Sequence, residues 1–486
     1  MSRHGKNLLY ILIPFVILIA GKIYMSSGLE VPVVAGDEFQ YLGKARYIAD
    51  AGEMPSYPAG GAPTNFGYSL LISPAFMLFD DPGAIYQAVL VLNAIMSATL
   101  YIWLFLLLFK IFGIERKHAF WIALVTSLYP AFLLQSNMAW TDAMTPAFFT
   151  LIILNFGYIA KKPTWLNISI FAVLSSYIFA IHVRGVPIPF LSSIFLIFMA
   201  RRKIIDVNFA VTAVIIMFFI SIFSLSYGDK LSFLMHGKES SIVLLITELI
   251  ARIEIFTLAF AVLISVFIFR EKTYYFLTYS LLGIFLSFLF YGDIVAKTAG
   301  LLIFAIALGF LFLMNFLKKL NKKEGFKIFA VMLVFGILTY LIIPGKEYID
   351  VVYSTFLVWL INASGKIFYL NVASFGFFGV GGYYALSYIL GSSGLKWKSI
   401  INDHKAMTLL FLLLTAGGMF LVVTNINLTG ISYRPDRFFY GRYVEVFAAP
   451  FFALGIAGLI KQKWIKNPYM MTFSVLFMIL FTGLPV

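Results

Sequence analysis

Long apolar stretches separated by short polar segments run through almost the whole chain. Most of them approach the roughly 20 residues that a helix needs to cross about 30 Å of hydrocarbon. The pattern therefore predicts an all-α polytopic integral membrane protein with about 13–15 transmembrane helices. The predicted spans are roughly 8–26, 84–109, 119–136, 143–160, 165–181, 185–200, 207–226, 254–269, 273–290, 296–317, 328–344, 371–391, 406–424, 444–460 and 468–485. The segments 241–253 and 350–370 allow a second interpretation, as helices lying at the membrane interface.

The composition agrees with a membrane protein. Hydrophobic residues make up 61% of the 486 residues and charged residues 12%, whereas a soluble domain is about half apolar and about one quarter charged. Cysteine is absent, which excludes disulfides and thiol chemistry. The five histidines lack the spacing of a dedicated zinc site. Because no internal repeat or low-complexity linker interrupts the pattern, residues 1–486 are predicted to form a single transmembrane domain.

Positive charge is distributed unevenly along the chain. Placing the N-terminus in the cytoplasm puts 23 of the 36 Lys and Arg residues on the inner side, with only 5 of the 22 acidic residues. Short cytoplasmic loops carry such an excess, so the net charge of +14 is mostly a topology signal, and nucleic acid is not expected as a partner. We expect a protein of the cytoplasmic (inner) membrane, in contact with membrane lipids. Its first span is interpreted as a retained anchor rather than a cleaved signal peptide.

The unusual polar residues fall on the predicted outer side. They are Asp37-Glu38 in the first extracytoplasmic loop 27–83, Trp140-Thr141-Asp142, His182-Val183-Arg184-Gly185, and a late basic loop 425–443 with Arg434, Arg437, Arg442 and Tyr443. Ionisable groups near a bilayer are costly and tend to mark function. The active site is therefore expected to be extracytoplasmic.

The pattern Gly36-Asp37-Glu38-x-x-Tyr41-x-x-x-Ala45 resembles the GT-C superfamily of membrane glycosyltransferases, which includes protein O-mannosyltransferases and lipid A aminoarabinose transferases. The segments 52–58 and 63–71 continue this resemblance, which implies amphipathic interfacial helices in loop 27–83 and a polyprenyl-phosphate-linked sugar donor. Two features depart from the family: a Lys-Pro-Pro run is replaced by Ala62-Pro63-Thr64-Asn65, and no soluble domain follows the last span. We therefore expect the site to be built from loops 27–83, 227–253, 345–370 and 425–443.

Glycosyl transfer needs a base for the acceptor hydroxyl and cations for the departing phosphate. Asp37 is the expected general base. Glu38 is expected to orient Asp37, to raise its pKa by like-charge repulsion, or to help hold a divalent cation. Asp142 is expected to orient the acceptor or to share that cation, and whether a metal is needed stays open. Phosphate binding is assigned to Arg184, Arg442, Arg437 and Tyr443, and substrate binding to Tyr41 and Tyr68. The acceptor is a surface glycan, a lipid or a protein.

Each assignment has a structural alternative. In these alternatives, Asp37-Glu38 only begin a helix and Asp142 only caps one. Arg184 reaches to the outer interface, and the arginines of 434–443 anchor the chain to lipid headgroups. His182 is then a packed or interfacial residue. Glu445 is expected to pair with Arg442. Two other functions compete with glycosyl transfer: a transporter or flippase of lipid-linked glycans, and a glycan polymerase or ligase outside the GT-C superfamily.

Overall fold

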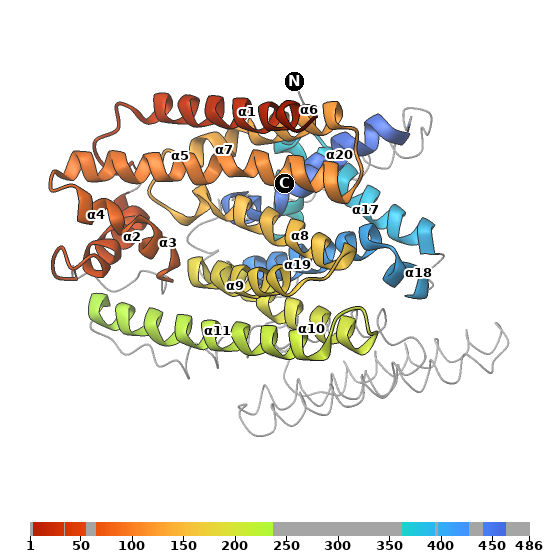
Figure 1. Cartoon of the computed structure of the whole chain (residues 1–486). Coiled ribbons are helices and arrows are strands. Elements are labelled where there is room, and N and C mark those ends of the chain that lie inside the picture. The colour runs from red at the N-terminus through yellow and green to blue at the C-terminus, as the bar shows by residue number, and fades with distance from the viewer. Residues whose placement is uncertain are drawn as a thin grey trace, which may run out of the picture. The chain divides into compact units, whose positions relative to one another are not determined.

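The computed structural model of the chain describes residues 3–33, 35–54, 65–236, 362–393, 397–426 and 441–462 (Figure 1). These residues belong to one compact unit that comprises Met1–Leu245 and Ile361–Val486. Every regular element within the described ranges is a helix. The all-α class predicted from the sequence is therefore confirmed for this part of the chain.

The first span and the long α5 helix lie side by side (Figure 1). Helix α1 covers Arg3–Ser26, and α5 covers Pro82–Leu106 and continues through a π-helical turn, η1, at Leu107–Ile111. Asp81 caps α5 by accepting a 2.8 Å hydrogen bond from the backbone of Ala84, and Pro82 fits the first helical position because it lacks an N–H that would go unsatisfied there.

Six further helices follow α5 in the chain. Their bounds are Arg116–Ser127 (α6), Pro130–Gln135 (α7), Thr145–Lys161 (α8), Trp165–Ile181 (α9), Pro187–Arg201 (α10) and Val207–His236 (α11). The predicted span 119–136 is not one helix: it is divided into α6 and α7 because Tyr129 adopts an extended ψ of 129° before Pro130, the conformation that a following proline favours.

Aromatic rings fill the core between these helices. Phe156 of α8 stacks on Phe411 at a centroid distance of 4.1 Å, and Phe195 of α10 meets Phe411 edge-on at 5.2 Å. Phe411 belongs to α19, which covers His404–Ile426. Offset and edge-to-face ring contacts add to the dispersion energy of a bundle core, and here they join α8, α10 and α19.

Three short helices occur in the described part of loop 27–83: α2 (Ala35–Ile48), α3 (Gly67–Ile72) and α4 (Pro74–Leu78). Helix α3 is tied to its surroundings by Tyr68, which donates a 3.1 Å hydrogen bond to Asn93 of α5, and by Ser69, which donates to the carbonyl of Tyr41. The loop therefore contains helices, and their position at the membrane interface stays a prediction.

The predicted span 371–391 is replaced by a bent pair of helices. Asn362–Ala373 and the following Phe377–Ile389, which is part of α17 (Phe377–Ser393), meet at 104°. Phe375 and Gly376 have positive φ angles of 52° and 80° at the bend, which a right-handed helix cannot contain. The remaining described elements are α18 (Trp397–Asn402), η5 (Gly441–Tyr443), η6 (Glu445–Phe447) and α20 (Ala448–Gln462).

Four described helices are long and apolar enough to cross a membrane, or five if the bent pair counts as one span. Five shorter apolar helices accompany them, among them α8 and α9. These helices are consistent with an all-helical membrane protein. The predicted spans between 241 and 361 and the span 468–485 lie outside the described residues, so the total of about 13–15 spans remains a prediction.

Candidate active site

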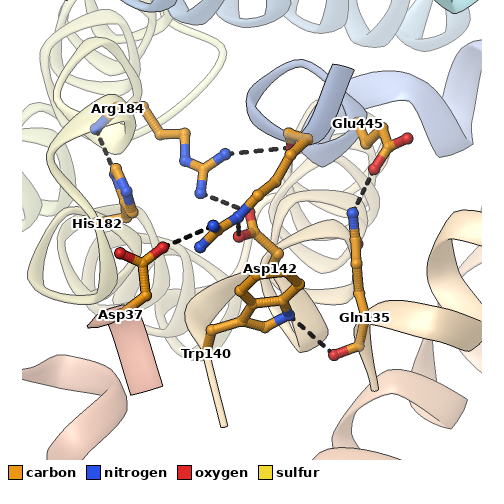
Figure 2. Close-up of polar contacts among 8 residues, drawn as sticks. Asp37, Gln135, Trp140, Asp142, His182, Arg184 and Glu445 are labelled. Carbon is orange, nitrogen blue, oxygen red and sulfur yellow. Dashed lines mark hydrogen bonds and ion pairs between the residues drawn. The ribbon is translucent and has the colours of Figure 1, made fainter. Parts of the chain in front are cut away.

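Four charged residues from four separate segments form one cluster, which we call the charge cluster: Asp37, Asp142, Arg184 and Arg442 (Figure 2). Asp37 lies in the first turn of α2, Asp142 in the 3₁₀ turn η2 (Thr141–Ala143), Arg184 in the 3₁₀ turn η3 (Val183–Gly185), and Arg442 in η5. The structure thus brings together four of the residues that the sequence placed on the outer side. The side of the membrane itself is not defined by this geometry.

The local sequence explains why these side chains end up in turns. Pro146 and Pro187 begin α8 and α10 shortly after Asp142 and Arg184, so each charged residue lies in a tight turn that directly precedes a proline-initiated helix. Gly185 allows η3 to lie against α9, because a Cβ there would approach the carbonyl oxygen of Ile178 to 2.7 Å. Only glycine permits so close a backbone approach.

Arg442 is the residue that joins the two carboxylates. Its Nε donates to Asp142 Oδ2 at 2.5 Å, and its Nη1 donates to Asp37 Oδ2 at 2.6 Å. The guanidinium also lies 3.7 Å from the ring centroid of Trp140, in cation–π geometry. A planar guanidinium can make these contacts at once because its donors point in fixed, divergent directions.

Asp142 and Arg184 form the buried base of the charge cluster. Arg184 Nη2 donates to Asp142 Oδ1 at 2.5 Å, and the two side chains are only 2% and 1% exposed. Burial by itself would raise the pKa of Asp142, but the charges of Arg184 and Arg442 lower it to about 2. The two structural alternatives are therefore wrong: no side chain caps α8, and Arg184 is buried rather than extended to an interface.

Asp37 is the accessible member of the charge cluster. Its side chain is 46% exposed, against 11% for its partner Arg442. Exposed ion pairs are weak because water competes for both charges. A ligand can therefore reach the Asp37–Arg442 pair, whereas the pair below it is closed off.

Glu38 does not share the environment of Asp37. It is fully buried and accepts hydrogen bonds from the hydroxyl of Tyr86 at 2.7 Å and from the backbone N–H of Ala139 at 2.6 Å. Neighbouring residues of a helix point about 100° apart, so the two carboxylates separate. The bonds of Glu38 fix α2 against α5 and the segment before η2, which corrects the prediction that it acts beside Asp37 in catalysis.

The predicted substrate-binding tyrosines are also buried. Tyr41 and Tyr68 meet edge-on at 5.2 Å and are 5% and 0% exposed, and burial raises the pKa of Tyr41 to about 12. Neither ring is open to a substrate, in contrast to the prediction. Tyr443 lies where it was expected, with Arg184 at 5.0 Å from its ring centroid. Arg437 and Arg434 lie outside the described residues.

The contacts that join Gln135, Trp140, Tyr369 and Glu445 beside the charge cluster were not predicted from the sequence. The buried carboxylate of Glu445 accepts hydrogen bonds from Gln135 and from the hydroxyl of Tyr369, so the predicted pairing of Glu445 with Arg442 is wrong. The indole Nε1 of Trp140 donates to the carbonyl of Gln135 at 3.0 Å (Figure 2). The hydrogen bonds of Glu445 fix the turn that follows Arg442. The hydrogen bond of Trp140 fixes the indole ring that the Arg442 guanidinium contacts. A single sequence gives no signal for contacts between positions so far apart.

His182 occupies the turn that precedes Arg184. Its ring is partly buried, and its Nδ1 accepts a 3.2 Å hydrogen bond from the backbone N–H of Arg184. The ring of Tyr443 lies 6.4 Å away. Burial and the nearby charge of Arg184 lower the pKa of His182 well below its usual range, so the ring is neutral at physiological pH.

The three carboxylates that were considered as metal ligands do not meet at one point. Asp37 and Asp142 both face arginine nitrogens, and Glu38 is bound elsewhere. Within the described ranges, no group of three or more His, Cys, Asp or Glu side chains is placed to hold a metal ion.

No protein-family model and no curated protein matches this chain.

Proposed function

We propose that this protein is a membrane glycosyltransferase that moves a sugar from a polyprenyl-phosphate-linked donor to an acceptor hydroxyl. The observation that carries the proposal is the accessible pair of Asp37 and Arg442, with a carboxylate and a guanidinium 2.6 Å apart at the open side of the charge cluster. Glycosyl transfer needs a base and an anion-stabilising group next to the same reacting carbon. The GT-C-like motif around Asp37 supports the same reaction.

In the proposed reaction, Asp37 takes the proton of the acceptor hydroxyl. The acceptor oxygen then bonds to the anomeric carbon of the sugar while the bond from that carbon to the phosphate oxygen breaks. The polyprenyl phosphate departs with the electron pair of this bond and so gains one negative charge. Arg442 stabilises that charge, and Arg184, fixed by Asp142, adds to the positive field beneath it.

The ion pair between Asp37 and Arg442 implies an order for donor binding and proton removal. Arg442 is bound to Asp37 through one guanidinium nitrogen, and this contact occupies the carboxylate oxygen Oδ2. A donor phosphate competes with Asp37 for Arg442 and frees the carboxylate as it binds. Donor binding therefore precedes proton removal in this scheme.

The proposal is tested with purified protein in proteoliposomes. A panel of short polyprenyl monophosphates that carry different sugars is added together with a membrane extract as acceptor, and release of the polyprenyl monophosphate is followed by ³¹P NMR. We expect release with the native chain and a loss of about 10²–10⁴-fold in Asp37→Asn, the usual size of general-base catalysis. Asp80→Asn, an exposed carboxylate in the same loop, is the matched control and should keep full activity. Equal release by both variants would refute the base assignment.

A transporter of lipid-linked glycans is the second candidate. Discontinuous helices line the substrate sites of many transporters, and the 104° bend between Asn362–Ala373 and Phe377–Ile389 is such an interruption. The same proteoliposomes separate the two functions. A transporter moves the intact lipid-linked sugar across the bilayer, whereas a transferase releases the polyprenyl phosphate.

A further inference from the structure

A partly exposed ring, His182, lies next to the charge cluster, and the proposed reaction gives it no role. The ring precedes η3 and is close enough to Arg184, Asp142 and Arg442 for their charges to affect it. In Figure 2 it lies on the same side of Asp142 as Asp37 does. The ring of Tyr443, the residue that follows Arg442, lies 6.4 Å from the His182 ring, so His182 is close to the turn that carries Arg442.

The hydrogen bond of His182 determines its tautomer. Because Nδ1 accepts from the backbone N–H of Arg184, the proton of the neutral ring must be on Nε2. Within the described ranges, the ring of His182 makes one hydrogen bond, the one at Nδ1. His182 thus offers one unused donor from a ring whose orientation is fixed.

A second unused donor lies next to it. Arg184 Nε is buried and has no hydrogen-bond partner within the described residues, although the rest of the guanidinium is engaged by Asp142 and by the carbonyl of Arg442. Buried donors without acceptors are rare, because each loses its hydration without a replacement. The partly exposed Nε2–H of His182, the buried Nε of Arg184 and the positive charges of Arg184 and Arg442 together favour an anion over a neutral hydroxyl as the ligand.

We propose that His182 is a substrate-binding residue, which donates from Nε2 to a non-bridging oxygen of the polyprenyl phosphate group. This inference rests on the proposed function and specifies its phosphate subsite. As a neutral donor, His182 holds the phosphate without transferring a proton to it, so the leaving group departs as an anion that the two arginines stabilise. The hydrogen bond from the backbone N–H of Arg184 to Nδ1 orients the ring of His182.

Two substitutions separate binding from local structure. His182→Asn keeps an oxygen that can accept from the backbone N–H two residues later, but it removes the donor at the Nε2 position. His182→Gln keeps an N–H donor near that position and gives up the local acceptor. His118→Asn is the matched control, because His118 is an exposed histidine beside Glu115 on α6.

Binding is measured on the purified full chain with farnesyl monophosphate as the probe and uncharged farnesol as the reference. We expect His182→Asn to weaken the affinity for farnesyl monophosphate about 10-fold or more, the usual weight of a hydrogen bond to a charged group. The affinity for farnesol and the unfolding temperature should stay unchanged, and His182→Gln and His118→Asn should stay close to the native chain.

Equal affinity of the native chain and His182→Asn for farnesyl monophosphate would overturn this assignment. A parallel loss for both probes would also overturn it, since that result means a structural role. Neither result affects the base assignment, which depends on the turnover of Asp37→Asn. Conversely, an active Asp37→Asn variant would refute the proposed reaction and leave the measured phosphate site in place.

Discussion

Asp37 and Arg442 lie 405 positions apart in the chain and form an ion pair of 2.6 Å between Oδ2 and Nη1. The pair is asymmetric. The carboxylate is half-exposed, whereas the guanidinium is mostly buried and fixed by Asp142 and the face of Trp140. Arg442 is therefore the fixed partner, and Asp37 is the one that a ligand can displace.

This asymmetry predicts that Asp37 contributes little to stability. An exposed ion pair is worth about 0–1 kcal/mol, so Asp37→Asn should leave the unfolding temperature of the detergent-purified protein almost unchanged while turnover falls. Differential scanning fluorimetry of the variant beside Asp80→Asn checks this. A large drop in the unfolding temperature for Asp37→Asn alone would mean that its carboxylate supports the fold.

Asp142 should behave in the opposite way. Asp142→Ala leaves Arg184 buried without its acceptor, and removal of one member of a buried ion pair costs about 3–5 kcal/mol. We expect a strongly lowered unfolding temperature or a loss of folded protein. The double variant with Arg184→Met removes the uncompensated charge and should recover part of the loss. If the double variant is less stable than Asp142→Ala, the buried pair is not the source of the effect.

Arg442→Lys should impair turnover although the charge is retained. A lysine ammonium is a single point charge and cannot reproduce the divergent bonds of the guanidinium to Asp142 and Asp37, nor its planar contact with Trp140. We expect a loss of about 10²-fold or more, the weight of one positioned anion-stabilising group, in the rate of polyprenyl phosphate release. A native rate in this variant would show that charge alone is sufficient.

The pKa of Asp142 predicts how acid affects the fold. The folded-state pKa of about 2 lies below the ordinary value of 3.8, so the carboxylate contributes stability above about pH 4 that is lost as the pH falls through about 2. The contribution is on the order of 2 kcal/mol. Stability measured across this interval should fall more steeply in the native chain than in Asp142→Asn. Parallel curves would contradict the assignment.

The predicted orientation is testable because the chain contains no cysteine. Asp80→Cys, in loop 27–83, should react with a membrane-impermeant maleimide added to intact cells, because the positive-inside distribution places this loop outside. Lys162→Cys, at the exposed end of α8, should react only after the membrane is opened. The reverse result would move the charge cluster to the cytoplasmic side.

The sequence by itself determined the class of the protein and the turns that carry its charges. Apolar stretches of spanning length predicted helices, and most of those that are described lie within a few residues of the expected bounds, because burial of the backbone in lipid leaves the helix as the main choice. Asp37, Asp142, Arg184 and Arg442 were identified as unusual for a similar reason, since charges near a bilayer need partners.

Only the tertiary structure decided which of these residues act together. The adjacent Asp37 and Glu38 look alike in the sequence, yet helix geometry turns one to the open side and the other into the interior. The two ion pairs of Arg442 and the buried hydrogen bonds of Glu445 depend on contacts between segments that are far apart in the chain. The lengths of the apolar stretches predict most helix bounds, although not the break at Tyr129 or the bend at Phe375, whereas the packing of helices against one another selects the partner of each side chain.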